Sequence, residues 1–189
     1  MPNEPWTYET LAQTDAATFE TILKTGTAPD PEQLNGWIYC GWNHEYVGKL
    51  SGEKFKKGFR KYNGQNYGFN ELCEQDNQKY QGDWKVRMLN GRPIQLGYFK
   101  VDLVKDEPPE PFYADYPQLG SFNYNVDIDQ GPNYPFRLIR DLVVLPNPGD
   151  HSLMLCKAHI EILHPNLYFF FCYFLLGHRL PIDFEPTYT

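Results

Sequence analysis

The sequence lacks the charge balance of a nucleic-acid-binding protein. Lys and Arg total 17 against 24 Asp and Glu, which gives a formal net charge of −7. A chain of this charge repels phosphate backbones, so we expect no nucleic-acid partner. The only basic cluster comprises Lys54, Lys56, Lys57, Arg60 and Lys61. We interpret it as a solvated turn or an edge strand protected by lysines.

Paired cysteines and clustered histidines are also missing. The four cysteines, Cys40, Cys73, Cys156 and Cys172, show no Cys-x-x-Cys spacing, and the five histidines show no metal-ligand spacing. We therefore expect free buried thiols and no metal site.

No apolar run is long enough for a membrane helix. The longest, residues 167–176, has about half the length that a bilayer requires. Residues 1–10 show no basic start followed by an apolar segment, so we expect no secretory signal and a cytoplasmic location. The motifs of phosphate loops, dinucleotide-binding turns and nucleophile elbows are absent, so no motif fixes an enzymatic reaction.

The sequence does carry the pattern of a β protein behind a short helical start. Apolar residues at helical spacing predict a helix over residues 15–25, and a second helical turn is expected at 32–34. Asn63-Gly64 and Asn90-Gly91 are each typical of the centre of a two-residue hairpin. A change of alternation near Gly97 predicts a β-bulge. Further strands are expected at residues 37–42, 83–89, 94–104, 121–128, 136–145, 152–163 and 167–176.

We therefore predict a mainly β fold, an antiparallel meander closed into a barrel. Closure is expected because it removes exposed strand edges. A single domain is expected over residues 1–189, with a helical lead-in at 1–34, the barrel at 35–180 and a C-terminal tail at 181–189.

The N-terminal helix, the Gly/Trp-rich segment Leu34-Asn35-Gly36-Trp37-Ile38-Tyr39-Cys40-Gly41-Trp42 and a basic residue after the last strand resemble the lipocalin-like, or calycin, superfamily. The closing segments also resemble small uncharacterised bacterial barrel proteins. The resemblance implies a barrel that holds a small apolar ligand. It also implies a plug in which Trp37 packs against Arg179. It leaves haem open as a cofactor, held through His178; no other cofactor is expected.

We expect the ligand to be fatty-acid-like or a pigment. Arg140 is in phase with Phe136, Leu138, Leu142 and Val144, so an inward guanidinium could anchor an acid group. The alternative is that Arg140 faces solvent or pairs with an internal acid. Small residues at Cys156 and Ala158 could leave a cavity, or neighbouring aromatic side chains could fill it. The expected ligand-binding residues are Trp37, Tyr39, Trp42, Phe122, Tyr124, Arg140, Met154, Cys156, Phe170 and Phe174.

Two other functional classes stay open. A small barrel enzyme, an isomerase or hydrolase, could act on an apolar substrate through acids such as Asp102, Asp127 or Asp141 with His159. Alternatively, a barrel with a filled core could recognise another protein. The sequence names neither the catalytic residues nor the oligomeric state.

Overall fold

Three short helices begin the computed structural model, which describes residues 4–44, 52–126, 135–162 and 167–183. They are α1 (Tyr8–Ala12), α2 (Ala16–Thr25) and α3 (Pro31–Leu34). Each begins where a side-chain oxygen of Thr7, Asp15 or Asp30 accepts a hydrogen bond from a backbone N–H of the first turn. Helices α2 and α3 agree with the sequence prediction, whereas α1 was not predicted.

The strands form a closed antiparallel barrel with the order β1-β10-β9-β8-β7-β6-β3-β2. The predicted mainly β fold is therefore confirmed. The barrel strands are β1 (Trp37–Asn43), β2 (Lys54–Tyr62), β3 (Gln65–Leu72), β6 (Gln95–Leu103), β7 (Gly120–Asn123), β8 (Ile139–Val144), β9 (Met154–Glu161) and β10 (Tyr168–Pro181). Strands β4 (Met88–Leu89) and β5 (Arg92–Pro93) make a separate hairpin, and three 3₁₀ helices are η1 (Val104–Asp106), η2 (Pro111–Asp115) and η3 (Phe136–Leu138).

The predicted turns and the predicted bulge are present. Asn63 and Gly64 both have positive φ and join β2 to β3, and Asn90 and Gly91 do the same between β4 and β5. On the β3–β6 ladder, Gly68 pairs with Phe99 while Asn70 pairs with Leu96, so β6 carries one extra residue next to Gly97. Gly97 has a φ of 57°, which its lack of a Cβ tolerates.

Other boundaries differ from the prediction. Residues 83–87 are not a strand, and the hairpin that they lead into pairs only two residues on each side. Residues 136–138 form η3 before β8 begins, and β7 ends at Asn123. The rest of the predicted strand at 121–128 lies partly outside the described residues, as does the last residue of the strand predicted at 152–163. The strand predicted at 167–176 is β10, which continues to Pro181.

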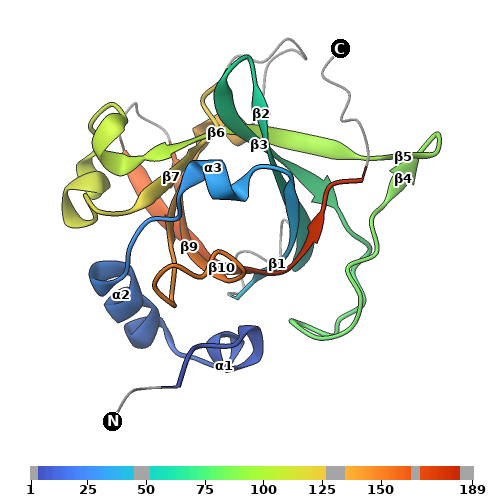
Figure 1. Ribbon diagram of the computed structural model, residues 1–189, viewed down its shortest axis with the longest axis horizontal. Helices are drawn as coiled ribbons and strands as arrows, with labels where there is room; N and C mark the ends of the chain where they lie inside the picture. Colours follow the sequence, from blue (N-terminus) through green and yellow to red (C-terminus); the bar gives the residue numbers. More distant parts are fainter. Residues whose placement is uncertain (1–3, 45–51, 127–134, 163–166, 184–189) are drawn as a thin grey trace.

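Aromatic side chains fill one half of the barrel interior. Tyr39, Phe59, Phe99 and Phe122 are buried, with neighbouring ring centroids 5.0–5.7 Å apart. Helix α3 lies across the same end of the barrel (Figure 1), and its Leu34 is fully buried in this interior cluster. This end of the barrel is therefore closed by side chains rather than open to a ligand.

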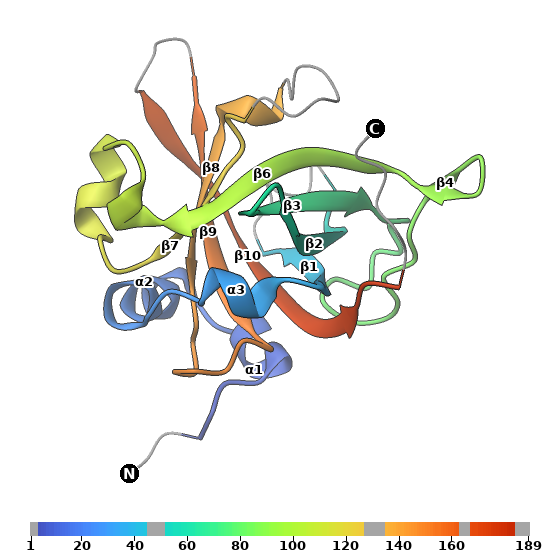
Figure 2. The same ribbon diagram turned by 45° about the horizontal axis from the view of Figure 1, so that its top comes forward.

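The outer face of several strands is also buried. Helices α1 and α2 and the segment that contains η1 and η2 lie on one side of the barrel (Figure 2). They cover Trp42 on β1, Leu142 and Val144 on β8, and Leu155 on β9, which all belong to a second apolar cluster. Strand β8 consequently has two buried faces.

Polar contacts fix α2 to the barrel. Glu20 accepts hydrogen bonds from Lys157 of β9 at 2.6 Å, from Tyr116 at 2.6 Å and from Tyr173 of β10.

Among the described residues, no helix is long and apolar enough to cross a membrane.

Candidate functional site

A lysine lies inside the barrel. Lys57 alternates along β2 with Phe55 and Phe59, so its side chain points inward with theirs. Only 1% of the side chain is exposed. The interpretation of this basic cluster as a solvated turn or an edge strand is therefore wrong, because β2 is paired on both sides, Lys57 faces the interior and Lys54 is buried as well.

Aromatic rings surround the Lys57 ammonium. Nζ lies 4.2 Å from the ring centroid of Phe99 and 5.0–5.8 Å from those of four other residues. Ring faces carry negative charge density and attract a cation at this range, most strongly where water is excluded. We name these rings the aromatic cage: Phe55, Phe99, Phe122, Tyr124 and Phe174.

Asp141 supplies the negative charge beside this cation. Its Oδ2 lies 3.6 Å from Lys57 Nζ, which is too long for a direct hydrogen bond. The Tyr124 hydroxyl bridges the two, because it accepts from Lys57 and donates to Asp141 Oδ2 at 3.1 Å. Asn70 Nδ2 donates to the same hydroxyl at 3.5 Å. Lys57, Asp141, Tyr124 and Asn70, which we name the interior polar cluster, thus come from separate parts of the barrel wall.

Burial shifts the pKa values of this cluster toward neutral forms. Desolvation lowers the pKa of Lys57, and the attraction of Asp141 offsets part of that shift. Desolvation raises the pKa of Asp141 to about 6, against the opposing effects of Lys57 and Tyr124. The pKa of Tyr124 is raised for the same reason, so its hydroxyl stays protonated. The cluster can therefore hold and relay a proton near neutral pH.

A buried charge pair is costly unless it is well paired or has a function. Replacing such a pair by apolar residues is often neutral or stabilising. Strongly perturbed groups within an interior site are accordingly candidates for a functional role. The interior polar cluster can donate hydrogen bonds, stabilise a cation and exchange a proton.

The structure brings most of the predicted ligand-binding residues to the barrel interior. Phe122, Tyr124 and Phe174 are members of the aromatic cage, and the Phe122 ring also packs against Phe59 with ring centroids 5.3 Å apart. The Tyr39 hydroxyl donates to the His151 carbonyl at 2.7 Å. Seven of the predicted residues belong to or pack against the apolar cluster inside the barrel: Trp37, Tyr39, Phe122, Tyr124, Met154, Cys156 and Phe174. Their role in binding stays a prediction.

Three of the predicted residues point away from the interior. Trp42 packs in the outer apolar cluster, and Phe170 is exposed on β10. The third residue, Arg140, was expected to point inward. Its neighbour Asp141 faces the interior, so the Arg140 side chain faces outward. Its guanidinium donates to the carbonyls of Arg137 and Ile139 and lies 3.9 Å from Glu110. The expectation of an inward guanidinium anchor is thus wrong. Neither stated alternative fits fully, because Arg140 is buried rather than solvent-facing and the acid nearest to it, Glu110, lies outside the barrel.

The two expected plug residues lie in contact. The Arg179 guanidinium carbon is 4.5 Å from the centroid of the Trp37 ring. The contact depends on a bulge, since Ile38 pairs with Leu180 while Cys40 pairs with Gly177, which leaves one extra residue on β10. The role of this pair as a plug stays a prediction.

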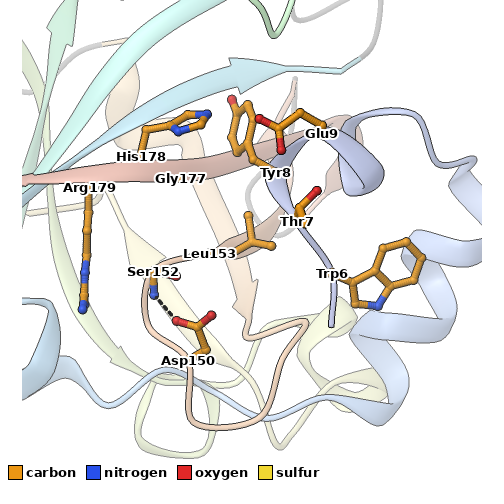
Figure 3. A pocket seen from close by; sticks show the side chains of 10 residues that line it. All are labelled: Trp6, Thr7, Tyr8, Glu9, Asp150, Ser152, Leu153, Gly177, His178 and Arg179. Atoms are coloured by element: carbon orange, nitrogen blue, oxygen red, sulfur yellow. Dashed lines mark hydrogen bonds between the residues drawn. The ribbon is translucent and has the colours of Figure 1, made fainter. Parts of the chain in front are cut away.

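The same bulge places His178 outside the barrel. Its φ is 48°, an unusual value for a residue other than glycine. Figure 3 shows His178 beside Tyr8 and Glu9, with Arg179 directed to the opposite side of the strand. The His178 ring centroid is 4.6 Å from that of Tyr8, and the residue lines two clefts of about 350 and 780 Å³. A haem held through His178 would lie in these outer clefts, and this role stays a prediction.

The candidate catalytic residues are divided by the barrel wall. Asp141 faces the interior, whereas His159 faces outward and stacks on Phe112 with ring centroids 4.1 Å apart. His159 is buried, and burial lowers its pKa to about 4. Asp102 lies on β6, where its Oδ2 is 2.5 Å from Lys100 Nζ. Asp127 lies outside the described residues. The structure therefore does not bring Asp141 and His159 into one site.

Sequence reasoning missed Lys57. The available signal was the alternation of Lys57 with Phe55 and Phe59, which places all three on one face of the strand. The usual exposure of lysine argues against an interior position, and that expectation prevailed.

In the part of the chain that the structure describes, no group of three or more His, Cys, Asp or Glu side chains could hold a metal ion. The closed barrel of the structure is compatible with a lipocalin-like fold. No protein-family model, no curated protein and no solved structure matches the chain, so these comparisons assign no family.

Proposed function

We propose that this protein binds a small apolar molecule with a neutral, hydrogen-bond-accepting head group in the half of the barrel interior that contains Lys57. The observation that carries the proposal is the Lys57 ammonium, buried within the aromatic cage and bridged to Asp141 by Tyr124. The cage supplies apolar contact area. The ammonium supplies the donor that orients the ligand.

The charge of the site favours a neutral head group over a carboxylate. Asp141 already provides a negative charge 3.6 Å from Lys57 Nζ. A ligand carboxylate would add a second negative charge in a medium of low dielectric constant. An ammonium has three donors, and the hydrogen bond to Tyr124 uses one of them. A carbonyl, amide or hydroxyl oxygen can accept another without a charge penalty.

The packing of the barrel favours a short ligand. The buried side chains of Leu34, Tyr39 and Phe59 fill the half that α3 closes. A long alkyl chain would have to displace them, and interiors packed at this density resist such insertion. The ligand therefore resembles a single substituted aromatic ring more than a long-chain fatty acid.

Isothermal titration with benzamide, benzoate and decanoate tests this proposal. We expect saturable binding of benzamide, at least tenfold weaker binding of benzoate and no binding of decanoate. The double variant Lys57→Met with Asp141→Asn removes both charges together, and it should weaken benzamide binding by more than tenfold.

A matched control removes another paired lysine of the barrel wall. Lys157→Met with Glu20→Gln breaks the pair that joins β9 to α2 on the outer face, and it should leave benzamide affinity unchanged. The proposal is wrong if no probe binds saturably, or if both double variants bind benzamide as well as the unaltered protein.

A further inference from the structure

We propose that Lys57 captures a small aldehyde or ketone as a reversible, protonated imine inside the barrel. This inference rests on the proposed function and names the reactive class of the head group. It is carried by the position of a primary amine within an aromatic cage, with a carboxyl group and a hydroxyl group beside it.

The side chain at this position is suited to nucleophilic attack. Lysine becomes a nucleophile when it loses its proton, and a desolvated apolar pocket promotes that loss. Burial is the largest effect on Lys57 and lowers its pKa. Arginine would satisfy the same cage and the same acid more firmly, but it stays protonated. A lysine at the centre of the interior polar cluster thus brings a reactivity that a purely structural cation does not need.

The reaction balances without an oxidant or reductant. The neutral Nζ of Lys57 forms a bond to the carbonyl carbon, and the electron pair of the C=O π bond moves to oxygen. Oxygen gains a proton and nitrogen loses one, which gives a carbinolamine. The remaining C–O bond then breaks as its oxygen takes a second proton and leaves as water, and the nitrogen lone pair forms the C=N bond. Because the nitrogen keeps its one remaining hydrogen, this step gives the cationic, protonated imine directly.

Asp141 and Tyr124 are placed to move these protons. The Tyr124 hydroxyl already bonds to both Lys57 and Asp141, so a proton can pass between the amine and the carboxyl group through it. The carboxyl group of Asp141 has a pKa of about 6 and therefore exists in both forms near neutral pH. We assign Asp141 the role of proton acceptor and donor, and Tyr124 that of the relay.

The site also suits the product. A protonated imine places its positive charge where the ammonium lies, 4.2–5.8 Å from the rings of the cage. Asp141 becomes its counterion at the same position. The rings stabilise a delocalised cation by cation–π attraction. An aromatic aldehyde adds a further ring for them to pack against.

Reductive trapping tests the inference. The full chain is incubated with benzaldehyde and treated with sodium borohydride, and the labelled lysines are located by peptide mass mapping. We expect the first benzyl group to appear at Lys57, on the order of tenfold faster than labelling at Lys85. The Lys85 side chain is 71% exposed and that of Lys57 is 1% exposed, so accessibility alone predicts the reverse order.

Competition and variants sharpen the result. Benzamide occupies the site without forming an imine, so it should protect Lys57 and leave the labelling of Lys85 unchanged. The Lys157→Met, Glu20→Gln control should label at Lys57 as the unaltered protein does. The Lys57→Met, Asp141→Asn variant should acquire no fast label, and its far-UV circular dichroism shows whether the barrel has formed.

The outcomes separate the two proposals. If benzamide binds but Lys57 is labelled no faster than Lys85, the imine inference is wrong and the noncovalent binding proposal stands. If benzamide does not bind and Lys57 stays unlabelled, both are wrong. Because the mapping is done on the unaltered chain, the result does not depend on the folding of a variant.

Discussion

At the scale of single residues, the interior pair of Lys57 and Asp141 is the most informative feature of the chain. Both side chains are at most 2% exposed, so water contributes almost nothing to their solvation. A buried pair tolerates the loss of both charges much better than the loss of one. The free energy of unfolding should therefore depend on whether the partners are removed singly or together.

We expect Lys57→Met alone to lower the free energy of unfolding by about 3 kcal/mol, because it leaves the Asp141 carboxyl group without its cation. Adding Asp141→Asn should recover most of that loss. Urea unfolding of the two single variants and the double variant measures the coupling. Additive effects of the two substitutions would contradict the pairing.

The raised pKa of Asp141 gives a second prediction at this scale. Its pKa is about 6 in the folded protein and near 3.8 when unfolded, so the folded state binds this proton more tightly. The resulting stabilisation is complete below about pH 4 and is lost as the pH rises through about 6. Relative to the Asp141→Asn variant, the unaltered protein should lose up to about 3 kcal/mol of its free energy of unfolding over this interval. Urea unfolding of both proteins between pH 4 and pH 7 measures the difference. If the two free energies change with pH in the same way, the raised pKa of Asp141 is refuted.

The ionisation of His159 should change the stability of the protein with pH in the opposite direction. Its pKa is lowered to about 4 from 6.5, because burial beside Phe112 disfavours the charged ring. The stabilisation from the neutral ring is complete above about pH 6.5 and is lost as the pH falls through about 4. His159→Phe keeps the stacked ring and removes the titration. It should therefore lose less stability than the unaltered protein on acidification, and urea unfolding at pH 4.5 and pH 7 compares them.

Single residues also show where sequence reasoning succeeds and where it fails. Met154 and Cys156 were expected to line the barrel interior and Ala158 to lie beside them, and all three belong to the apolar cluster of the interior. Arg140 was placed on the wrong face because Leu142 and Val144 are as apolar as Val143 and Leu145. Once α2 and the η1–η2 segment cover the outside, both faces of β8 are buried. Hydrophobicity then carries no information about which face is inside.

At the scale of elements, the first helix is held by a close contact with the last strand. The Tyr8 ring of α1 packs against Gly177, where an added Cβ would come within 2.4 Å of Tyr8 Cδ2. The unpredicted helix therefore depends on a glycine that lies more than 160 residues away in the sequence. Its own sequence contains only one helical turn and a Thr7 cap, which is a weak local signal.

Gly177→Ala should displace Tyr8 and lower the free energy of unfolding by about 1–3 kcal/mol, as expected for overpacking. In the background of Tyr8→Ala the same substitution should cost much less, because the ring that it meets is absent. Thermal unfolding of the four proteins in this double-mutant cycle measures the interaction. Tyr8→Phe serves as the control, since it keeps the ring. Equal costs of Gly177→Ala in both backgrounds would show that the contact does not hold α1.

Element boundaries followed local chemistry closely where a turn required it. The two Asn-Gly turns were predicted because few residues adopt positive φ. The bulge near Gly97 was predicted from the change of hydrophobic alternation along its strand. The 3₁₀ helices η1 and η2 lack a comparable periodic signal, and neither was predicted. These two helices cover outward-facing side chains of the barrel strands, including Ser121 on β7 and His159 on β9.

At the scale of the whole molecule, closure of the barrel creates the candidate site. Lys57, Tyr124 and Asp141 are separated by 67 and 17 residues along the chain, and only the pairing of successive strands brings them together. The sequence predicted the closed barrel from its meander. It could not predict this convergence, because the register and the strand tilt decide which inward side chains meet.

The filled and polar halves of the interior together define the proposed ligand. Aromatic packing and Leu34 close the end beneath α3, and the interior polar cluster occupies the region beyond Phe99 and Phe122. The proposed site, limited by the filled half and holding a paired ammonium, would select small neutral molecules. This selection is the central claim of the account.

Native mass spectrometry of the purified protein, compared with its mass after denaturation, tests that claim most directly. The account predicts that the native mass of the unaltered protein exceeds its denatured mass by that of one small molecule, either retained from purification or added as benzamide. It also predicts that Lys57→Met with Asp141→Asn abolishes the difference. Equal retention by both proteins, or a native mass that benzamide never shifts, would contradict it.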